Sequence, residues 1–171
     1  MISPEFCVTQ ARYARWRNRQ VVLAVADLEP GLRRRGQEAG AAALTGLCAR
    51  QIRHDQLWLS RVDGAERPAL DGAYLDDHIQ DWGAWRRGRQ SLDARLHDWT
   101  TRLTQPELEG ELFWYSALDQ RAVSRPMWIC VSHLFTTQTE FRGRIEGQLV
   151  RMGAQLDGGE LIGLPHDLDW M

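Results

Sequence analysis

The sequence predicts an all-α protein, built as a four-helix bundle. Four segments, at about residues 3–28, 41–62, 73–103 and 126–152, carry apolar side chains at steps of three or four residues. Helices with one apolar stripe each bury those stripes most simply against one another. Stretches rich in Gly, Pro or acidic residues separate the segments. The chain has 171 residues, the size of one domain, so we expect a single domain over 1–171.

The first predicted helix, 3–28, begins with residues that suit a helix start. Ser3 can accept a hydrogen bond from a free N–H of the first turn, and Pro4 lacks the N–H that would be unsatisfied there. Glu5 places a negative charge near the positive end of the helix dipole. Residues 29–40 carry a Pro and several Gly, which predicts a loop before the second helix.

The second half of the chain is predicted to hold two further helices and a non-helical connection. The third helix covers 73–103. At 110–125 the sequence changes to the aromatic run ELFWY and the turn-like run SALDQ, which predicts a short hairpin or an extended crossover. Ser124 can then cap the fourth helix, 126–152, and we expect an irregular C-terminal tail over 153–171.

Charge and composition exclude some classes of partner. The formal net charge of −2 gives no general attraction to nucleic acid or to an anionic membrane. The arginine clusters GLRRRG (31–36) and WRRGRQ (85–90) have acidic residues nearby, and we interpret both as solvent-exposed faces. The longest apolar run, VVLAVA (21–26), is too short to span a bilayer.

Cysteines and tryptophans give two further expectations. The three cysteines form no CxxC pair, so we expect buried free thiols in a reducing, cytoplasmic compartment. Among the eight tryptophans, we expect Trp16, Trp58 and Trp128 to serve packing. We interpret four others as candidates for an interface or a pocket wall: Trp82, Trp85, Trp99 and Trp170.

Four stretches occur in order along the predicted helices: ARYARWRNRQVV (11–22), DQLWLSR (55–61), LDDH (75–78) and HLFTTQTEFRG (133–143). Together they resemble the DinB (damage-inducible, YfiT-like) family, with a similarity that runs over about residues 3–153. The resemblance implies a bundle whose helices run up, down, down and up, with a long crossover between the second and the third. It also implies a relation to metal-dependent hydrolases and thiol transferases.

Members of that family typically hold nickel or zinc with one histidine from the second helix and two, four residues apart, from the fourth. The matching positions here are Arg50, Thr137 and Phe141. A guanidinium cannot be deprotonated to bind a metal, a phenyl ring has no donor atom, and a lone threonine hydroxyl is a poor ligand. We therefore expect no cofactor at the family's metal position.

A displaced metal site stays open as an alternative. His54 lies one turn after Arg50, and His133 lies one turn before Thr137. On antiparallel helices both shifts go the same way along the bundle, by about 5.4 Å. A carboxylate such as Asp77 or Asp81 could supply a third ligand, so nickel or zinc held by His54, His133 and Asp77 stays open on this sequence.

The preferred functional hypothesis is a metal-free binding module for a small molecule or a protein, acting as a homodimer. Arg50 could hold an anionic ligand, pair with a carboxylate such as Asp55, or point to solvent. The alternative is a metal-dependent or thiol-dependent transferase or hydrolase with a displaced site near His54 and His133. DNA binding is a third option, which the net charge disfavours. The candidate pocket at the family's metal position comprises Arg50, His54, His133, Thr137 and Phe141.

Overall fold

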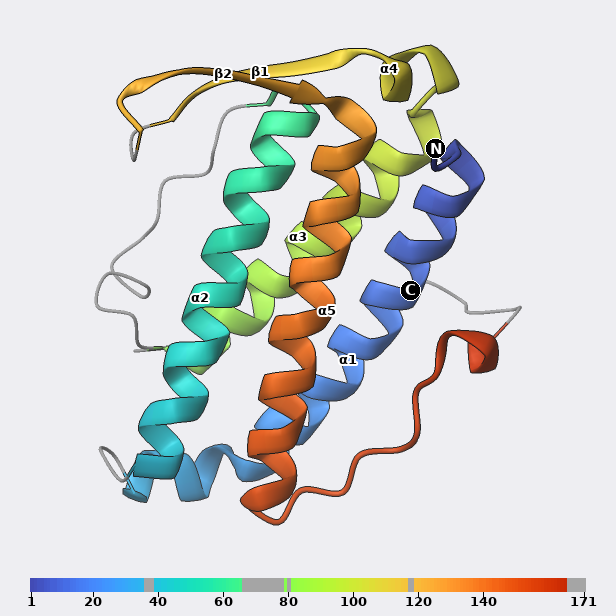
Figure 1. The fold of residues 1–171 in the computed structure, drawn as a ribbon. Helices are drawn as coiled ribbons and strands as arrows, with labels where there is room; N and C mark the ends of the chain where they lie inside the picture. The colour runs from blue at the N-terminus through green and yellow to red at the C-terminus, as the bar shows by residue number, and fades with distance from the viewer. Residues whose placement is uncertain (36–38, 66–78, 80, 117–118, 166–171) are drawn as a thin grey trace.

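The described chain is mostly helical, which agrees with the predicted all-α class. It also contains a small two-stranded sheet. The computed structural model describes residues 1–35, 39–65, 79, 81–116 and 119–165. Figure 1 shows the long helices side by side, with the strands across one end. Helix α1 lies against α3 and α5, and α2 lies against the same two helices. The long helices are α1 (Pro4–Arg35), α2 (Ala39–Val62), α3 (Trp82–Arg102) and α5 (Met127–Arg151).

Helix α1 is longer than the sequence predicts. Ser3 caps it as expected, because its hydroxyl accepts a hydrogen bond from the N–H of Phe6 at 3.2 Å. The predicted loop at 29–40 is wrong: the helix continues to Arg35. A proline inside a helix removes one hydrogen bond and bends the axis without having to end it. In Figure 1 the last turns of α1 run across the lower end toward α2.

Helix α3 begins later than the sequence predicts. Ile79 and Asp81 are not helical, whereas the expected helix covered 73–103. The carboxylate of Asp81 accepts hydrogen bonds from the N–H groups of Gly83 at 2.7 Å and Ala84 at 3.2 Å, so this side chain fixes the start at Trp82. The rest of the predicted first turns, 73–78 and 80, lies outside the described residues.

The connection between α3 and α5 contains a short helix and the predicted hairpin. Helix α4 (Gln105–Glu109), absent from the prediction, is held by a capping box between Thr104 and Glu107. Strands β1 (Glu111–Ser116) and β2 (Arg121–Pro126) then pair antiparallel. Strand β1 contacts both α2 and α5, so the hairpin covers one end of these helices (Figure 1).

The cap predicted for the last long helix is wrong. Ser124 belongs to β2, and its hydroxyl donates to the carboxylate of Glu111 on β1. Helix α5 starts after Pro126 instead. It ends at Arg151, and Gly153, two residues later, has a φ of +94°, in the left-handed region that favours glycine.

The described part of the C-terminal tail packs back on α1. The hydroxyl of Tyr13 donates to the carbonyl of Gly159 at 2.7 Å, and Arg17 donates to the carbonyl of Asp157 at 3.0 Å. A Cβ at Gly159 would lie 1.7 Å from a guanidinium nitrogen of Arg17, so a side chain there would require this guanidinium to move. Arg17 also pairs with Glu146 of α5 at 2.7 Å, which ties the tail, α1 and α5 together.

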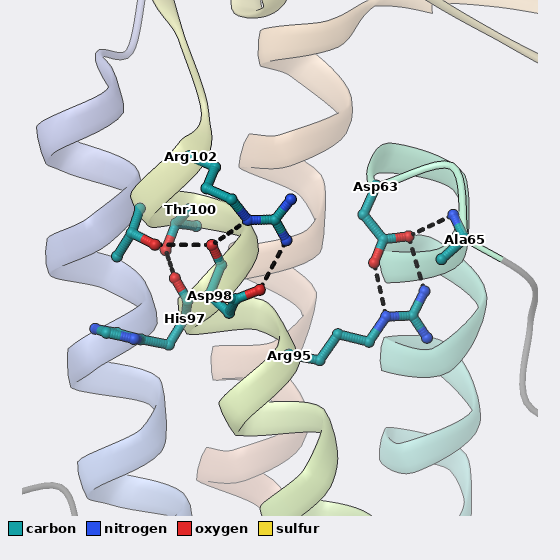
Figure 2. A network of polar contacts seen from close by, with 8 residues as sticks. Asp63, Ala65, Arg95, His97, Asp98, Thr100 and Arg102 are labelled. Carbon is teal, nitrogen blue, oxygen red and sulfur yellow. Dashed lines mark hydrogen bonds and ion pairs between the residues drawn. The ribbon is translucent and has the colours of Figure 1, made fainter.

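A second polar contact fixes the end of α2 against α3. Figure 2 shows Arg95 donating from two nitrogens to the two oxygens of Asp63, at 2.6 and 2.7 Å. Asp63 directly follows α2, and it also accepts the N–H of Ala65 at 3.0 Å. The same figure shows Arg102 paired with Asp98 on the exposed side of α3.

Burial corrects one interpretation of the tryptophans. Trp82, Trp85 and Trp99 are buried in the core, so they form neither a pocket wall nor an exposed interface within the described chain. Trp170 lies outside the described residues. All three cysteines are buried free thiols, as expected. In the described ranges, no helix has the length and apolar character needed to cross a bilayer.

Candidate functional site

His54 occupies the centre of the candidate site between α2 and α5. Its ring centroid lies 5.6 Å from that of His133 and 5.9 Å from that of Phe141. Its Nδ1 atom lies 3.1 Å from a carboxylate oxygen of Asp55. Its Nε2 atom is buried and has no hydrogen-bond partner among the described residues. The structure therefore brings His54, His133 and Phe141 together.

His133 lies at the outer side of this cluster. Its ring meets Trp58 edge-on, with centroids 4.6 Å apart, and its Nδ1 atom is 3.4 Å from the hydroxyl of Thr137. Partial burial lowers the pKa of His133, and the neighbouring His54 and Arg61 lower it further. The imidazole is therefore neutral at physiological pH.

The hairpin completes the cluster with a residue that the sequence reasoning missed. Trp114 of β1 packs against Trp58 with ring centroids 5.7 Å apart. The guanidinium of Arg61 lies 4.7 Å from the Trp58 ring and 5.2 Å from the Trp114 ring, which is a cation–π geometry on both. The alternation in ELFWY could have revealed this, because Leu112 and Trp114 share the inner face of the strand.

Arg50 does not pair with Asp55, the carboxylate that the sequence suggested as its partner. Its side chain is exposed to solvent. Asp55, the proposed partner, is buried and pairs with Arg89 of α3. The exposure of Arg50 therefore excludes a buried pairing with Asp55 and leaves open a solvent-facing side chain or contact with an anionic ligand.

The metal alternatives can be compared with the donor atoms that are present. The family's three-histidine set does not fit, because Arg50, Thr137 and Phe141 supply no imidazole. The displaced set keeps His54 and His133 close together, whereas Asp77 lies outside the described residues. In the part of the chain that is described, no group of three or more His, Cys, Asp or Glu side chains is arranged to hold a metal ion.

A buried polar network lies beside the cluster and was not predicted. Asp55 accepts hydrogen bonds from Arg89 and, at 2.8 Å, from Gln138. Arg89 also forms an ion pair with Asp93 at 2.9 Å, and Asp93 accepts from Asn18 at 2.8 Å. Each long helix contributes to this network, which we call the interior polar layer: Asn18 (α1), Asp55 (α2), Arg89 and Asp93 (α3), and Gln138 (α5).

The pKa values of the two carboxylates of the interior polar layer shift in opposite directions. Burial raises the pKa of Asp93 above its ordinary value, although Arg89 and Asn18 oppose this. Burial also acts to raise the pKa of Asp55, but Arg89, His54 and Gln138 outweigh it, so the pKa of Asp55 is lowered. Arg89 thus favours the ionised form of both carboxylates, and the effect of burial on the pKa outweighs the groups that oppose it only at Asp93.

The sequence contained a signal for Arg89 that the interpretation of WRRGRQ as a solvent-exposed face overlooked. Arg89 follows Trp85 by four residues and precedes Leu92 and Leu96 by three and seven. These are helical spacings of one face, and Trp85, Leu92 and Leu96 are all buried. An arginine on an apolar stripe predicts a buried charge that needs a carboxylate partner.

Comparisons of the chain with protein-family models, with curated proteins and with solved structures find no match in any of the three.

Proposed function

We propose that this chain is a DinB-like four-helix bundle, made by α1, α2, α3 and α5 in up-down-down-up order, that acts as a metal-free binding module in the cytoplasm. The helix contacts and directions support that topology, because α1 and α5 run one way in Figure 1 while α2 and α3 run the other. The proposal includes a homodimer. Light scattering on the full chain should then give twice the 19.7 kDa chain mass.

The observation that carries the proposal is the packing of Phe141 against His54. Phe141 stands where the resemblance implies a metal-binding histidine, and its ring centroid lies 5.9 Å from that of His54. An aromatic ring there supplies contact area and no donor atom. His133, Trp58 and Trp114 extend the ring contacts outward, which favours a protein partner over a ligand cavity at this position.

Elemental analysis of the purified chain tests this proposal. The protein should be expressed without added chelator, and nickel and zinc should be measured per chain. The proposal predicts no stoichiometric metal, and the same result for His54→Ala and for His133→Ala. One nickel or zinc ion per chain, lost in both variants, would contradict it.

A second candidate function is a transferase or hydrolase whose site is displaced to His54 and His133. One observation favours it: Asp55 lies 3.1 Å from Nδ1 of His54, and Nε2 of the same ring is buried with no hydrogen-bond partner in the described chain. A carboxylate beside one nitrogen orients an imidazole so that the other nitrogen can take a proton or bind a metal.

The same pair of variants separates the two functions. A displaced enzyme site would lose metal or turnover of a thiol or ester substrate in His54→Ala. A metal-free binding module has neither bound metal nor turnover, so His54→Ala would change neither. Asp55→Asn is a poor test of catalysis, because Asp55 also holds Arg89 in the interior.

A further inference from the structure

A groove lies between α1 and α5, separate from the cluster around His54. Its volume is about 270 Å³, the space of about nine water molecules at roughly 30 Å³ each. Two phenyl rings form its apolar part, and hydroxyl and amide groups form its polar part. The lining residues are Phe6, Gln10, Ser132, Phe135, Thr136 and Thr139.

A buried cation stands behind the polar wall of this groove. Arg142 is 2% exposed, and one of its terminal nitrogens donates to the hydroxyl of Thr139 at 3.1 Å. The other terminal nitrogen is buried and has no hydrogen-bond partner among the described residues. The guanidinium also lies over the ring of Tyr13, 5.1 Å from its centroid.

The carboxylates near Arg142 are paired with other groups. Glu146 forms its ion pair with Arg17, and Asp55 forms its ion pair with Arg89. Burial lowers the pKa of Arg142, yet a guanidinium remains charged at neutral pH. A buried charge without an oppositely charged partner of its own is costly. An anion that reached Arg142 would therefore be stabilised.

The polar wall offers hydrogen-bond donors toward the groove. Because the oxygen of Thr139 accepts from Arg142, its own proton is left to donate. Thr136 and Gln10 make no hydrogen bond within the described structure, so their donors are available too. Ser132 differs, since its hydroxyl donates to the carbonyl of Trp128 at 2.7 Å.

We propose that the groove between α1 and α5 binds a small carboxylate with an apolar body. The carboxylate receives hydrogen bonds from Thr136 and Thr139, and Arg142 supplies the positive charge behind them. The apolar body lies between Phe6, which is partly exposed at the surface, and Phe135, which is buried. This inference does not rest on the DinB resemblance, and it names a site beyond the proposed function.

Calorimetric titration with benzoate tests the site. Benzamide, which has the same ring and no charge, is the control ligand, and inorganic phosphate is an anion without the apolar body. We expect benzoate to bind more tightly than either. Arg142→Met and Thr139→Val should each weaken benzoate binding by about ten-fold or more, because each removes a part of the charge-assisted contact.

Two control variants match these changes in chemistry. Arg144→Met removes an exposed arginine of the same helix, which pairs with Glu140. Thr101→Val removes an exposed hydroxyl on α3. Both should keep the affinity for benzoate. Circular dichroism checks that each variant is folded, and Thr139→Val, which conserves volume, decides the test if Arg142→Met does not fold.

The inference would be overturned by no benzoate binding to the folded chain, or by equal affinity for benzamide and benzoate. Unchanged affinity of folded Thr139→Val for benzoate would overturn it as well. Tighter binding of phosphate than of benzoate would also overturn it, because the apolar body would then have no role. None of these results bears on the metal content, so the proposed function is tested separately.

Discussion

Asp55 of α2 and Arg89 of α3 form an ion pair in the interior of the protein, where their side chains are 3% and 2% exposed. Gln138 of α5 donates to the same carboxylate, and Arg89 reaches Asp93, which binds Asn18 of α1. One interior polar layer therefore joins all the long helices. Buried charge pairs of this kind favour one arrangement of helices over others, because a slipped helix would leave a charge unpaired.

Removing one member of this pair should destabilise the fold strongly. Arg89→Met leaves two buried carboxylates without their cation, so we expect a loss of about 3–5 kcal/mol in the free energy of unfolding, measured by urea denaturation. Arg102→Met is the matched control on α3. Its pair with Asp98 is 69% and 68% exposed, and its removal should cost no more than about 0.5 kcal/mol.

The losses of stability caused by changes at Asp55 and at Arg89 should be coupled. The double variant Asp55→Leu with Arg89→Met should lose less stability than the sum of the two single variants, since each single change strands the other charge. Additive losses would mean that the ion pair does not couple α2 to α3.

The bidentate contact between Arg95 and Asp63 should fix the end of α2. Arg95→Met removes two hydrogen bonds to a carboxylate in a partly exposed setting, so we expect a loss of about 1–2 kcal/mol in unfolding free energy. Amide hydrogen exchange should rise in the last turn of α2, near Val62. Exchange that stays as slow as in the parent chain would show that other contacts hold this end.

His133 should titrate below the ordinary histidine value of about 6.5. Burial and the nearby His54 and Arg61 disfavour its charged form. Between its pKa in the folded chain and about 6.5, the unfolded chain then binds more protons, so His133 lowers stability as pH falls through that window. NMR titration of the ring measures the pKa directly.

Two variants separate the causes of this shift. His54→Gln removes a neighbouring ring that lowers the pKa of His133, so this pKa should rise in the variant. His133→Gln should weaken the loss of stability between pH 7 and the folded pKa. A His133 ring that titrates at or above 6.5 in the parent chain would mean that it is fully solvated.

The helices were predictable from apolar spacing, but their ends depended on single side chains. Pro30 and Gly31 both disfavour a helix interior and so predict a break, yet α1 continues through them to Arg35. Asp81 looks like one more acidic residue in the first turns of a helix, and only its hydrogen bonds to Gly83 and Ala84 identify it as the cap. Such choices depend on local geometry that spacing does not encode.

The candidate site was predictable from the sequence only in part. His54 and His133 were expected close together on facing helices, near the family's metal position, and their ring centroids lie 5.6 Å apart. Phe141, at one of the family's ligand positions, lies 5.9 Å from His54. Trp114 was missed because it arrives from the hairpin, through a long-range contact with Trp58. Arg89 was missed because a charge was assumed to be exposed, although its carboxylate partner comes from another helix.

The most direct test of the central claim is a zinc titration of two forms of the chain: the parent, and the triple variant Arg50→His, Thr137→His and Phe141→His. If these positions are those of the family's metal site, the variant should bind one zinc ion per chain, because it would carry a facial set of three imidazoles. The parent should bind none stoichiometrically. A parent chain that binds one zinc as tightly as the variant, or a folded variant that binds none, would contradict the account.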